Sequence, residues 1–252
     1  MSGKLVLIGC GPGGVDLLTI RAARKIAEAD LVLYDRLVDP DVVALAGSGA
    51  ECRYVGKGCS DGGIQQADIN AYLRSALLAG RVVARLKSGD PMVFGRAAEE
   101  IAVAVEIGAE VEIVPGVTAA LAAASDALIT VTERAELQSF VMTTGRAADS
   151  DAQPDWANVV KPGVCAAFYM GVAQAWRIQS VLMGAGVPGN APADWVEKAG
   201  QTDMRTIPTR LDRLALDARA NNVTNPAILL VRYPLSLAEA RGVPAPSLQR
   251  AL

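Results

Sequence analysis

The chain has 252 residues, of which 51% are hydrophobic, enough to build the core of one large or two smaller domains. Its net charge is −3 with both signs mixed, so no basic field indicates nucleic acid as a partner. The four cysteines form no CxxC pair and histidine is absent, which argues against a metal site and against a Ser-His-Asp triad. We expect no metal cofactor.

No stretch approaches the roughly 18 uncharged apolar residues that a membrane-spanning helix needs. The first residues, Met1 to Ile8, lack the basic, apolar and cleavage regions of a secretion signal. The sequence therefore predicts a cytoplasmic protein without a membrane partner.

Short β-rich runs alternate with helical patterns in the first half of the chain. This alternation predicts βαβ units and a mainly parallel sheet. Gly80 and Gly108 mark two of the helix ends. The predicted strands are 4–8, 31–34, a run ending at 55, 81–86 and 111–114, and the predicted helices are 16–28, 65–78 and 96–107.

The second half begins after Pro115-Gly116 with an Ala-rich helical segment at 117–125. A polar stretch at 147–154 is predicted to be a surface loop. We predict an α/β fold of two domains, residues 1–115 and 116–252, each with a mainly parallel or mixed sheet. The strands predicted in the second domain are 140–143, 164–169, 194–196 and 227–231.

A glycine-rich turn, Gly9-Cys10-Gly11-Pro12-Gly13-Gly14, follows the first predicted strand, and Asp35 ends the next strand about twenty residues on. This spacing is also that of the dinucleotide-binding fingerprint. Pro12, however, has no N–H for a pyrophosphate, and Asp16 puts a carboxylate where a phosphate would sit. The turn favours a phosphate-free, cationic ligand such as S-adenosylmethionine, with a tight turn that binds nothing as the alternative.

A second glycine segment, Ser88-Gly89-Asp90-Pro91-Met92-Val93-Phe94-Gly95-Arg96, follows the strand at 81–86 and precedes a helix. Ligands of parallel α/β sheets bind at such carboxyl ends of strands. Gly89 permits close approach of the backbone, and Pro91 fixes the turn after Asp90. A rigid turn without a ligand is again the alternative.

Six segments in order along the chain resemble the tetrapyrrole methylase family. Two of them, which contain Tyr34-Asp35-Arg36-Leu37-Val38 and Gly56-Lys57, narrow the resemblance to uroporphyrinogen-III C-methyltransferases. The six are the glycine turn, Leu33–Val38, Val55–Lys57, Arg85–Pro91, Val114–Ala120 and Phe168–Gly171.

The resemblance implies a two-domain α/β enzyme that is a homodimer and binds S-adenosylmethionine in a cleft between its domains. It implies methylation of two pyrrole carbons of uroporphyrinogen III to give precorrin-2, an intermediate in sirohaem and cobalamin biosynthesis. Asp35 and Lys57 fall on positions proposed as proton acceptor and proton donor. The implied substrate contacts are Arg85, Arg96, Gln138 and Met170, and the implied donor contacts are Pro12, Ser88, Gly89, Asp90, Val93, Thr118, Ala119, Met170 and Ala199.

This chemistry suits a chain without histidine. A reduced pyrrole carbon is an enamine-like nucleophile, so a positively charged methyl donor needs mainly alignment and desolvation. After transfer a proton leaves the macrocycle, and Asp35 can accept it or stabilise the cationic ring. A helix cap or a salt bridge for Asp35, and a solvated loop charge for Lys57, are the alternatives.

Uroporphyrinogen is a polycarboxylate, so arginines are expected around it because their planar fork binds carboxylates in a bidentate manner. Arg85 and Arg96 flank the second glycine segment, and Arg36, Arg134 and Arg146 follow other strands. Each of these arginines has a structural salt bridge as the alternative.

Five residues depart from the family pattern. Relatives usually have an acid at Gly14, a glycine at Ser88 and a histidine at Glu133, and they often have histidine at Gly62 and Arg146. Glu133 adds negative charge near a site for a polyanion, which weakens substrate binding unless Arg134 or Arg146 neutralises it. Three other functions remain open: another precorrin or tetrapyrrole methylase, an NAD-dependent oxidoreductase and a non-catalytic binding protein.

Overall fold

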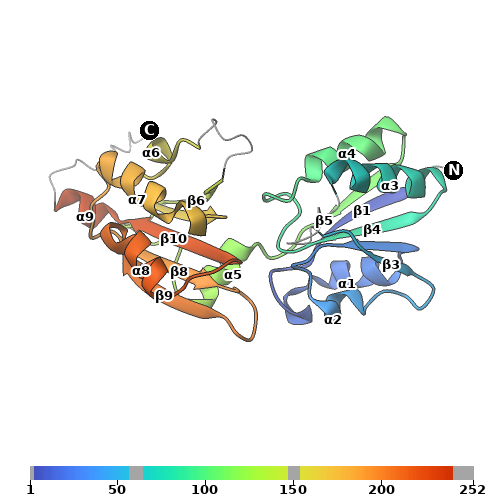
Figure 1. Cartoon of the computed structure of the whole chain (residues 1–252), viewed down its shortest axis with the longest axis horizontal. Helices are drawn as coiled ribbons and strands as arrows, with labels where there is room; N and C mark the ends of the chain where they lie inside the picture. The colour runs from blue at the N-terminus through green and yellow to red at the C-terminus, as the bar shows by residue number, and fades with distance from the viewer. Residues whose placement is uncertain (1–2, 57–64, 147–153, 241–252) are drawn as a thin grey trace, which may run out of the picture. The chain divides into compact units, whose positions relative to one another are not determined.

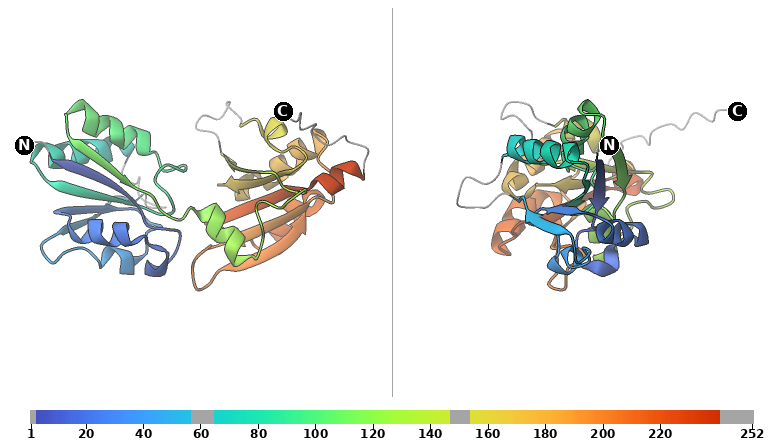
Figure 2. Two further views of the ribbon diagram at one scale, coloured as in Figure 1. Left: turned by 180° about the vertical axis from the view of Figure 1, so that it is seen from behind. Right: turned by 90° about the vertical axis from the view of Figure 1, so that its right-hand side faces the viewer.

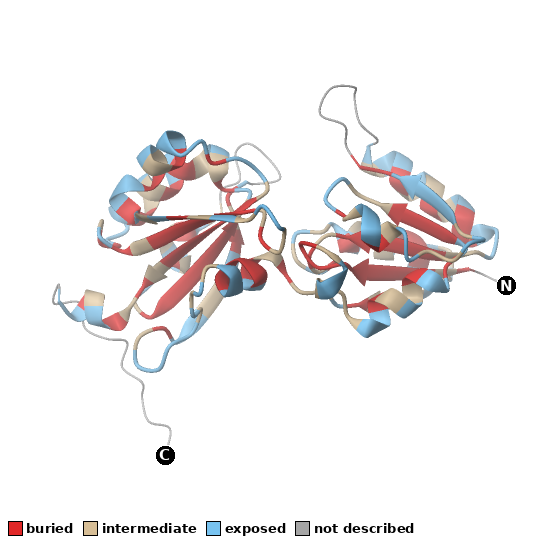
Figure 3. Ribbon diagram, turned by 90° about the horizontal axis from the view of Figure 1, so that it is seen from below, coloured by how far each residue is buried: buried red, intermediate tan, exposed pale blue. Residues whose placement is uncertain are grey.

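The computed structural model describes residues 3–56, 65–146 and 154–240. The chain divides into two compact units, Met1–Ala119 and Ala120–Leu252, each built around a five-stranded sheet. The boundary predicted at residues 115 and 116 falls just before this division. Figure 3 shows that in each unit the buried residues lie mainly on the strands and on the helix faces toward them.

The sheet of the first unit is parallel throughout and has the order β3-β2-β4-β1-β5. The central strands β1 and β4 are almost wholly buried, as expected for parallel strands covered on both faces. The parallel sheet predicted from the sequence is therefore confirmed. Its strands are β1 (Lys4–Gly9), β2 (Leu31–Tyr34), β3 (Glu51–Tyr54), β4 (Val82–Lys87) and β5 (Glu110–Val114).

Helices cover both faces of this sheet. Alternate residues of β1 point to opposite faces, so that Ile8 packs with α1 and α2, whereas Leu7 packs with α3 and α4 (Figure 1). The helices are α1 (Ile20–Ala27), α2 (Pro40–Val43), α3 (Gln66–Leu78) and α4 (Ala97–Glu106).

The helix predicted at 16–28 is wrong at its start. A short 3-10 helix, Val15–Leu17, comes first, and the backbone is then extended at Leu18 and Thr19. The Thr19 hydroxyl accepts a hydrogen bond of 3.1 Å from the amide of Ala22, which caps α1. Threonine competes for backbone donors in this way at helix starts, and the apolar pattern alone did not reveal it.

The second unit has a mixed sheet in the order β6-β7-β10-β8-β9, in which only β6 and β7 form a parallel pair. Helices α6, α7 and α8 cover one face, and α5 lies on the other (Figures 1 and 2). The strands are β6 (Ser139–Thr144), β7 (Val164–Tyr169), β8 (Pro192–Glu197), β9 (Arg205–Arg210) and β10 (Ala227–Tyr233). The helices are α5 (Ala119–Asp126), α6 (Trp156–Val159), α7 (Ala175–Gly184), α8 (Leu214–Ala220) and α9 (Leu235–Glu239).

Strand β9 was not predicted from the sequence. It lies at the edge of its sheet, and Ile207 is its one buried residue. Pro208 lies within it, which an edge strand tolerates because one side of its backbone needs no hydrogen bonds.

Among the helices in residues 3–56, 65–146 and 154–240, none combines the length and the apolar character that a membrane-spanning segment requires.

Candidate active site

The carboxyl ends of β1 and β4 are neighbours, and the chain leaves them toward opposite faces of the sheet. The loop after β1 leads to α1, whose Ile26 packs on one face, and the loop after β4 leads to α4, whose Val103 packs on the other. Ligands of open parallel sheets bind where neighbouring connections diverge in this way. Both glycine segments therefore lie at the position where this fold binds ligands.

Three glycines let the loops after β1, β4 and β5 pack directly on one another. A Cβ atom on Gly9 would lie 2.5 Å from the Gly116 nitrogen and 2.9 Å from the Gly89 oxygen. A Cβ atom on Gly116 would likewise meet the backbones of Gly9 and Gly89. Since these neighbours are backbone atoms with little freedom to move, Gly9 and Gly116 exclude any side chain, whereas Gly89 is favoured by its positive φ angle of 74°.

Hydrogen bonds fix the same three loops. The amides of Gly11 and Gly89 each donate to the carbonyl of the other, at 3.2 and 2.8 Å. The carboxylate of Asp90 accepts from the amide of Met92 at 2.8 Å and from the amide of Gly116 at 3.0 Å. Asp90 thus links the loop after β4 to the loop after β5 through its side chain.

These hydrogen bonds also limit which ligand can bind at the edge of the sheet formed by the carboxyl ends of β1, β4 and β5. The amides of Gly11 and Gly89 are engaged within the protein, the amide of Cys10 donates to the carbonyl of Lys87, and Pro12 has none. A pyrophosphate cradle depends on free backbone N–H groups at such a turn. The edge is therefore better suited to a ligand that does not need those donors.

Several of the predicted donor contacts come together here. The open side of Gly89 faces Thr118 and Ala119, whose nearest backbone atoms lie 3.6–4.0 Å from a Cβ placed on Gly89. Pro12 follows Gly11, which is bridged to Gly89, and is buried. Ser88 and Val93 belong to the same loop and are partly buried.

The end of the loop after β4 has a strained backbone. Phe94 and Arg96 adopt positive φ angles of 52° and 54°, which are costly for residues with a side chain. Arg96 is exposed and makes two hydrogen bonds of 2.7 Å to Glu99. The predicted substrate contact Arg96 is thus placed at the protein surface by an unusual turn.

Asp35 follows β2 and forms an ion pair with Arg85 of the neighbouring strand β4. Its Oδ1 atom accepts a hydrogen bond of 2.7 Å from Arg85 Nη2. Asp35 is partly exposed, whereas Arg85 is 2% exposed and also donates to the carbonyl of Leu86 at 2.9 Å. The predicted substrate contact Arg85 is therefore engaged inside the protein, and the group it presents toward solvent is Asp35.

A second carboxylate, which the sequence did not single out, completes this network. Glu100 of α4 is 0% exposed and accepts from Arg85 Nε at 3.1 Å. Lys87 lies two residues beyond Arg85 on the same face of β4, and its Nζ lies 2.8 Å from Glu100 Oε2. The same Nζ donates to the carbonyl of Gly95 at 2.7 Å. Two buried cations and two carboxylates are thus connected.

The pKa values of the two cations shift in opposite directions. Burial opposes the charge of Arg85, but Asp35 and Glu100 outweigh it and raise the pKa of Arg85. Burial lowers the pKa of Lys87, and the charge of Arg85 lowers it further against the attraction of Glu100. Arg85 therefore remains a cation beside Asp35.

In the second unit, Met170 and Ala199 lie at one edge of the sheet. Strands β7 and β8 flank β10, with their last residues Tyr169 and Glu197 opposite the first residues of β10. Met170 and Ala199 follow these ends. The residues next to them are bonded to α5: the Tyr169 hydroxyl accepts from the amide of Ala120 at 3.0 Å, and Asp126 accepts from the amide of Gly200 at 2.7 Å.

Gln138 does not join Met170 and Ala199. It precedes β6, and its amide donates to the carbonyl of Gly163 at 2.7 Å, just before β7 begins. This is the opposite end of the sheet from Met170, roughly 20 Å along a strand of that length. Its placement gives no support to a substrate contact shared with Met170.

Of the two predicted catalytic residues, Asp35 is described above, and Lys57 lies outside the described residues.

Cys10 occupies the glycine turn but is not a nucleophile there. Burial raises its pKa to about 12, and burial has the same effect on Cys165. At pH 8 both groups remain thiols, whereas Cys52 is exposed. We expect iodoacetamide to alkylate Cys52 of the folded protein while Cys10 and Cys165 stay unmodified, as measured by peptide mass spectrometry. Rapid modification of Cys10 without unfolding would contradict this burial.

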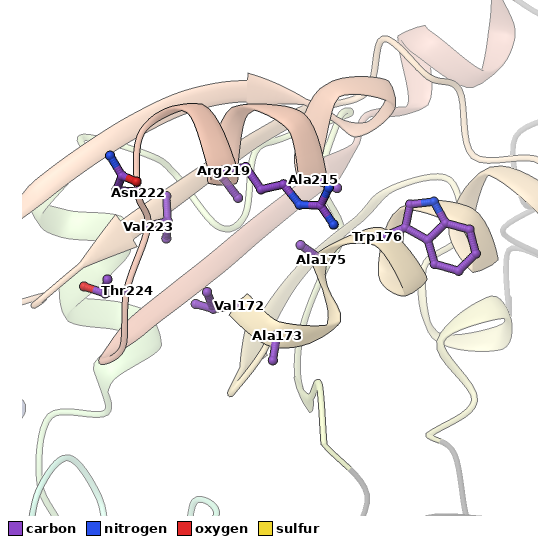
Figure 4. Close-up of a pocket in the computed structure, with 10 residues that line it drawn as sticks. Val172, Ala173, Ala175, Trp176, Ala215, Arg219, Asn222, Val223 and Thr224 are labelled. Atoms are coloured by element: carbon purple, nitrogen blue, oxygen red, sulfur yellow. The ribbon is translucent and has the colours of Figure 1, made fainter. Parts of the chain in front are cut away.

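A cavity of about 470 Å³ lies in the second unit between the start of α7 and the end of α8. Figure 4 shows Val172 and Ala173 on one side, Val223 and Thr224 on another, and the Arg219 side chain between them and Trp176. None of the predicted site residues that the structure describes lines this cavity.

In the described ranges, no group of three or more cysteine or acidic side chains is arranged to hold a metal ion.

Two solved methyltransferases are similar to this chain in fold and in sequence. A cobalt precorrin-4 methyltransferase superposes with a TM-score of 0.81, at 27% identity over 91% of this chain and 95% of its own. The uroporphyrin-III C-methyltransferase from Thermus thermophilus, complexed with S-adenyl homocysteine, superposes with a TM-score of 0.77, at 35% identity over 91% of this chain and 92% of its own.

Curated relatives are longer proteins. The siroheme synthases of Pseudoalteromonas atlantica and Chromobacterium violaceum are each 38% identical over 94% of this chain, and the match covers 51% of each relative. The chain thus spans about half the length of these relatives. The family model for tetrapyrrole (corrin/porphyrin) methylases matches residues 4–215. With the fold and the glycine-lined strand ends in place, the chain belongs to the tetrapyrrole methylase family.

Proposed function

We propose that the protein is an S-adenosylmethionine-dependent C-methyltransferase that converts uroporphyrinogen III to precorrin-2. The observation that carries the proposal is the packing of Gly9, Gly89 and Gly116 at the carboxyl ends of β1, β4 and β5. The solved uroporphyrin-III C-methyltransferase that is 35% identical to this chain was crystallised with S-adenyl homocysteine, which supports the same class of donor here.

The residues at this edge fit a cationic donor without phosphate. The backbone amides of Cys10, Gly11 and Gly89 donate to carbonyl groups within the protein, so these three donors do not serve a phosphate. When bound, the donor supplies an electrophilic methyl group. The residues we propose to hold it are Pro12, Ser88, Gly89, Asp90, Val93, Thr118, Ala119, Met170 and Ala199.

The substrate side rests on Asp35 and on exposed arginines. Asp35 is partly exposed and hydrogen-bonded to Arg85, and we propose that its carboxylate accepts a proton from the methylated ring. Arg36 is exposed beside it, and Arg96 is exposed at the loop after β4. We propose that these guanidinium groups bind carboxylates of the tetrapyrrole. The homodimer and the cytoplasmic location expected from the resemblance belong to the same proposal.

A precorrin methylase is the second candidate. It is favoured by the TM-score of 0.81 with the cobalt precorrin-4 methyltransferase, which is above the 0.77 for the uroporphyrin-III enzyme. Sequence identity points the other way, at 27% against 35%. Since the substrate is read by side chains rather than by the fold, we rank uroporphyrinogen III first.

The experiment tests the identity of the donor and the identity of the substrate in two separate steps. Calorimetry is expected to show binding of S-adenosylhomocysteine and none of NAD, and NAD binding alone would support the oxidoreductase alternative. Donor with a labelled methyl group is then offered with uroporphyrinogen III or with a cobalt precorrin. We expect label in the product from uroporphyrinogen III. Label only in the precorrin would select the second candidate.

A further inference from the structure

We propose that Glu100 is a positioning residue whose buried carboxylate holds Arg85 against Asp35 and Lys87 against the loop that carries Arg96. The proposal rests on the proposed function, because it assigns Asp35 and Arg96 to the reaction. It adds a residue of α4 that touches neither donor nor substrate and acts through its two cationic neighbours.

The first arm runs from Glu100 to Asp35. The Oε1 atom of Glu100 accepts from Arg85 Nε at 3.1 Å, and the Nη2 atom of the same guanidinium donates to Asp35 at 2.7 Å. A planar guanidinium held by two carboxylates through two of its nitrogens cannot rotate without breaking one of these bonds. The position of the Asp35 carboxylate therefore depends on Glu100.

The second arm runs from Glu100 to the loop after β4. Lys87 Nζ donates to Glu100 Oε1 at 2.9 Å, lies 2.8 Å from Oε2, and donates to the carbonyl of Gly95 at 2.7 Å. Gly95 stands between Phe94 and Arg96, the two residues with positive φ angles. A strained turn persists only when its surroundings hold it. The ammonium group of Lys87 supplies one such constraint directly before Arg96.

Charge and burial make Glu100 the common point of both arms. Glu100, Arg85 and Lys87 are 0%, 2% and 4% exposed, so none of their charges is screened by water. Glu100 has the two buried cations as its ion-pair partners among the described residues. Loss of its charge leaves both cations without that counter-ion and releases both arms together.

The main test compares Glu100→Gln with the wild type in methyl transfer to uroporphyrinogen III. We expect kcat to fall on the order of 10²-fold and KM to rise on the order of tenfold, while the Kd for S-adenosylhomocysteine changes less than about twofold. Lys87→Met removes only the second arm, so we expect it to raise KM on the order of tenfold and to change kcat less than about threefold. The matched control is Glu106→Gln, since Glu106 is an exposed acid of the same helix that pairs with Arg74 at the surface.

A purely structural role of Glu100 predicts a different pattern. In Lys87→Met/Glu100→Met the buried charges balance again, and the unfolding midpoint is expected to return toward that of the wild type. If Glu100 positions the site, kcat of this double variant stays low. If kcat recovers with stability, or if Glu100→Gln turns over like the wild type, the proposal is wrong. If Glu100→Gln does not fold, the kcat of the double variant is the test of the proposal.

A wild type that does not methylate uroporphyrinogen III would contradict the proposed function but not the positioning. The crystal structure of Glu100→Gln then decides the positioning. We expect loss of both the Arg85–Asp35 and the Lys87–Gly95 contact. Retention of either contact at its present 2.7 Å would overturn the proposal.

Discussion

Replacing Asp35 by Asn is expected to slow methyl transfer to uroporphyrinogen III by about 10²–10⁴-fold, the range typical of a lost general base. The amide oxygen can still accept the hydrogen bond from Arg85, so the fold and the position of β2 are retained. What disappears is the ability to take a proton from the methylated ring. Stopped-flow or discontinuous assays of kcat, with the Kd of S-adenosylhomocysteine measured on the same preparation, give the result.

Asp41→Asn is the matched control. Asp41 is an exposed carboxylate in the same unit, on α2, and we assign it no role in the reaction. Its variant is expected to turn over like the wild type. If Asp35→Asn also keeps the rate of the wild type, Asp35 is not the proton acceptor, and its bond to Arg85 is a structural ion pair.

Replacing Gly116 by Ala is expected to abolish the tight packing of the three loops. The new Cβ would lie 2.7 Å from the carbonyl carbon of Gly9 and would also meet the carbonyl oxygen of Gly89, so backbone has to move. Overpacking of this kind costs about 1–3 kcal/mol of stability. Because the displaced segments form the proposed donor site, we expect the Kd for S-adenosylhomocysteine to rise by on the order of tenfold or more.

Gly49→Ala separates this effect from the general effect of adding a methyl group. A Cβ on Gly49 meets no heavy atom within 4 Å, and Gly49 is not among the glycines of positive φ. Its variant is expected to bind S-adenosylhomocysteine like the wild type and to unfold at a similar temperature. Unchanged donor affinity in Gly116→Ala would show that the donor does not bind at this edge.

The parallel sheet of the first unit was predictable because its strands are short apolar runs separated by helices. Residues such as Leu7 and Ile8 are both buried, since helices cover both faces, and a continuous run of this kind is easily recognised. Strand β9 was missed because only Ile207 is buried and Pro208 argues against a strand. The start of α1 was missed because Thr19 caps it, an effect of one hydroxyl.

The glycine loops could be located from the sequence because each combines glycines with a position directly after a strand. The role of Arg85 could not be predicted from the sequence, because its burial depends on the packing of α4 over β4. One signal was present: Arg85 and Lys87 alternate with apolar residues in a strand that is buried on both faces. Two charges on one face of such a strand require a buried carboxylate, and Glu100 is that carboxylate.

Gln138 is a predicted site residue that the structure does not bring together with Met170 and Ala199. Its assignment followed the resemblance alone, without a local motif, and the sheet places it at the far end from Met170. Register and strand direction decide which residues meet, and neither is encoded in the residue itself.

The most direct test of the central claim is the mass of the tetrapyrrole formed when the protein is incubated with S-adenosylmethionine and uroporphyrinogen III. We predict a product that has gained two methyl groups, with S-adenosylhomocysteine released in the same proportion. An unchanged tetrapyrrole, under conditions in which the protein binds S-adenosylhomocysteine, would contradict uroporphyrinogen III as the substrate.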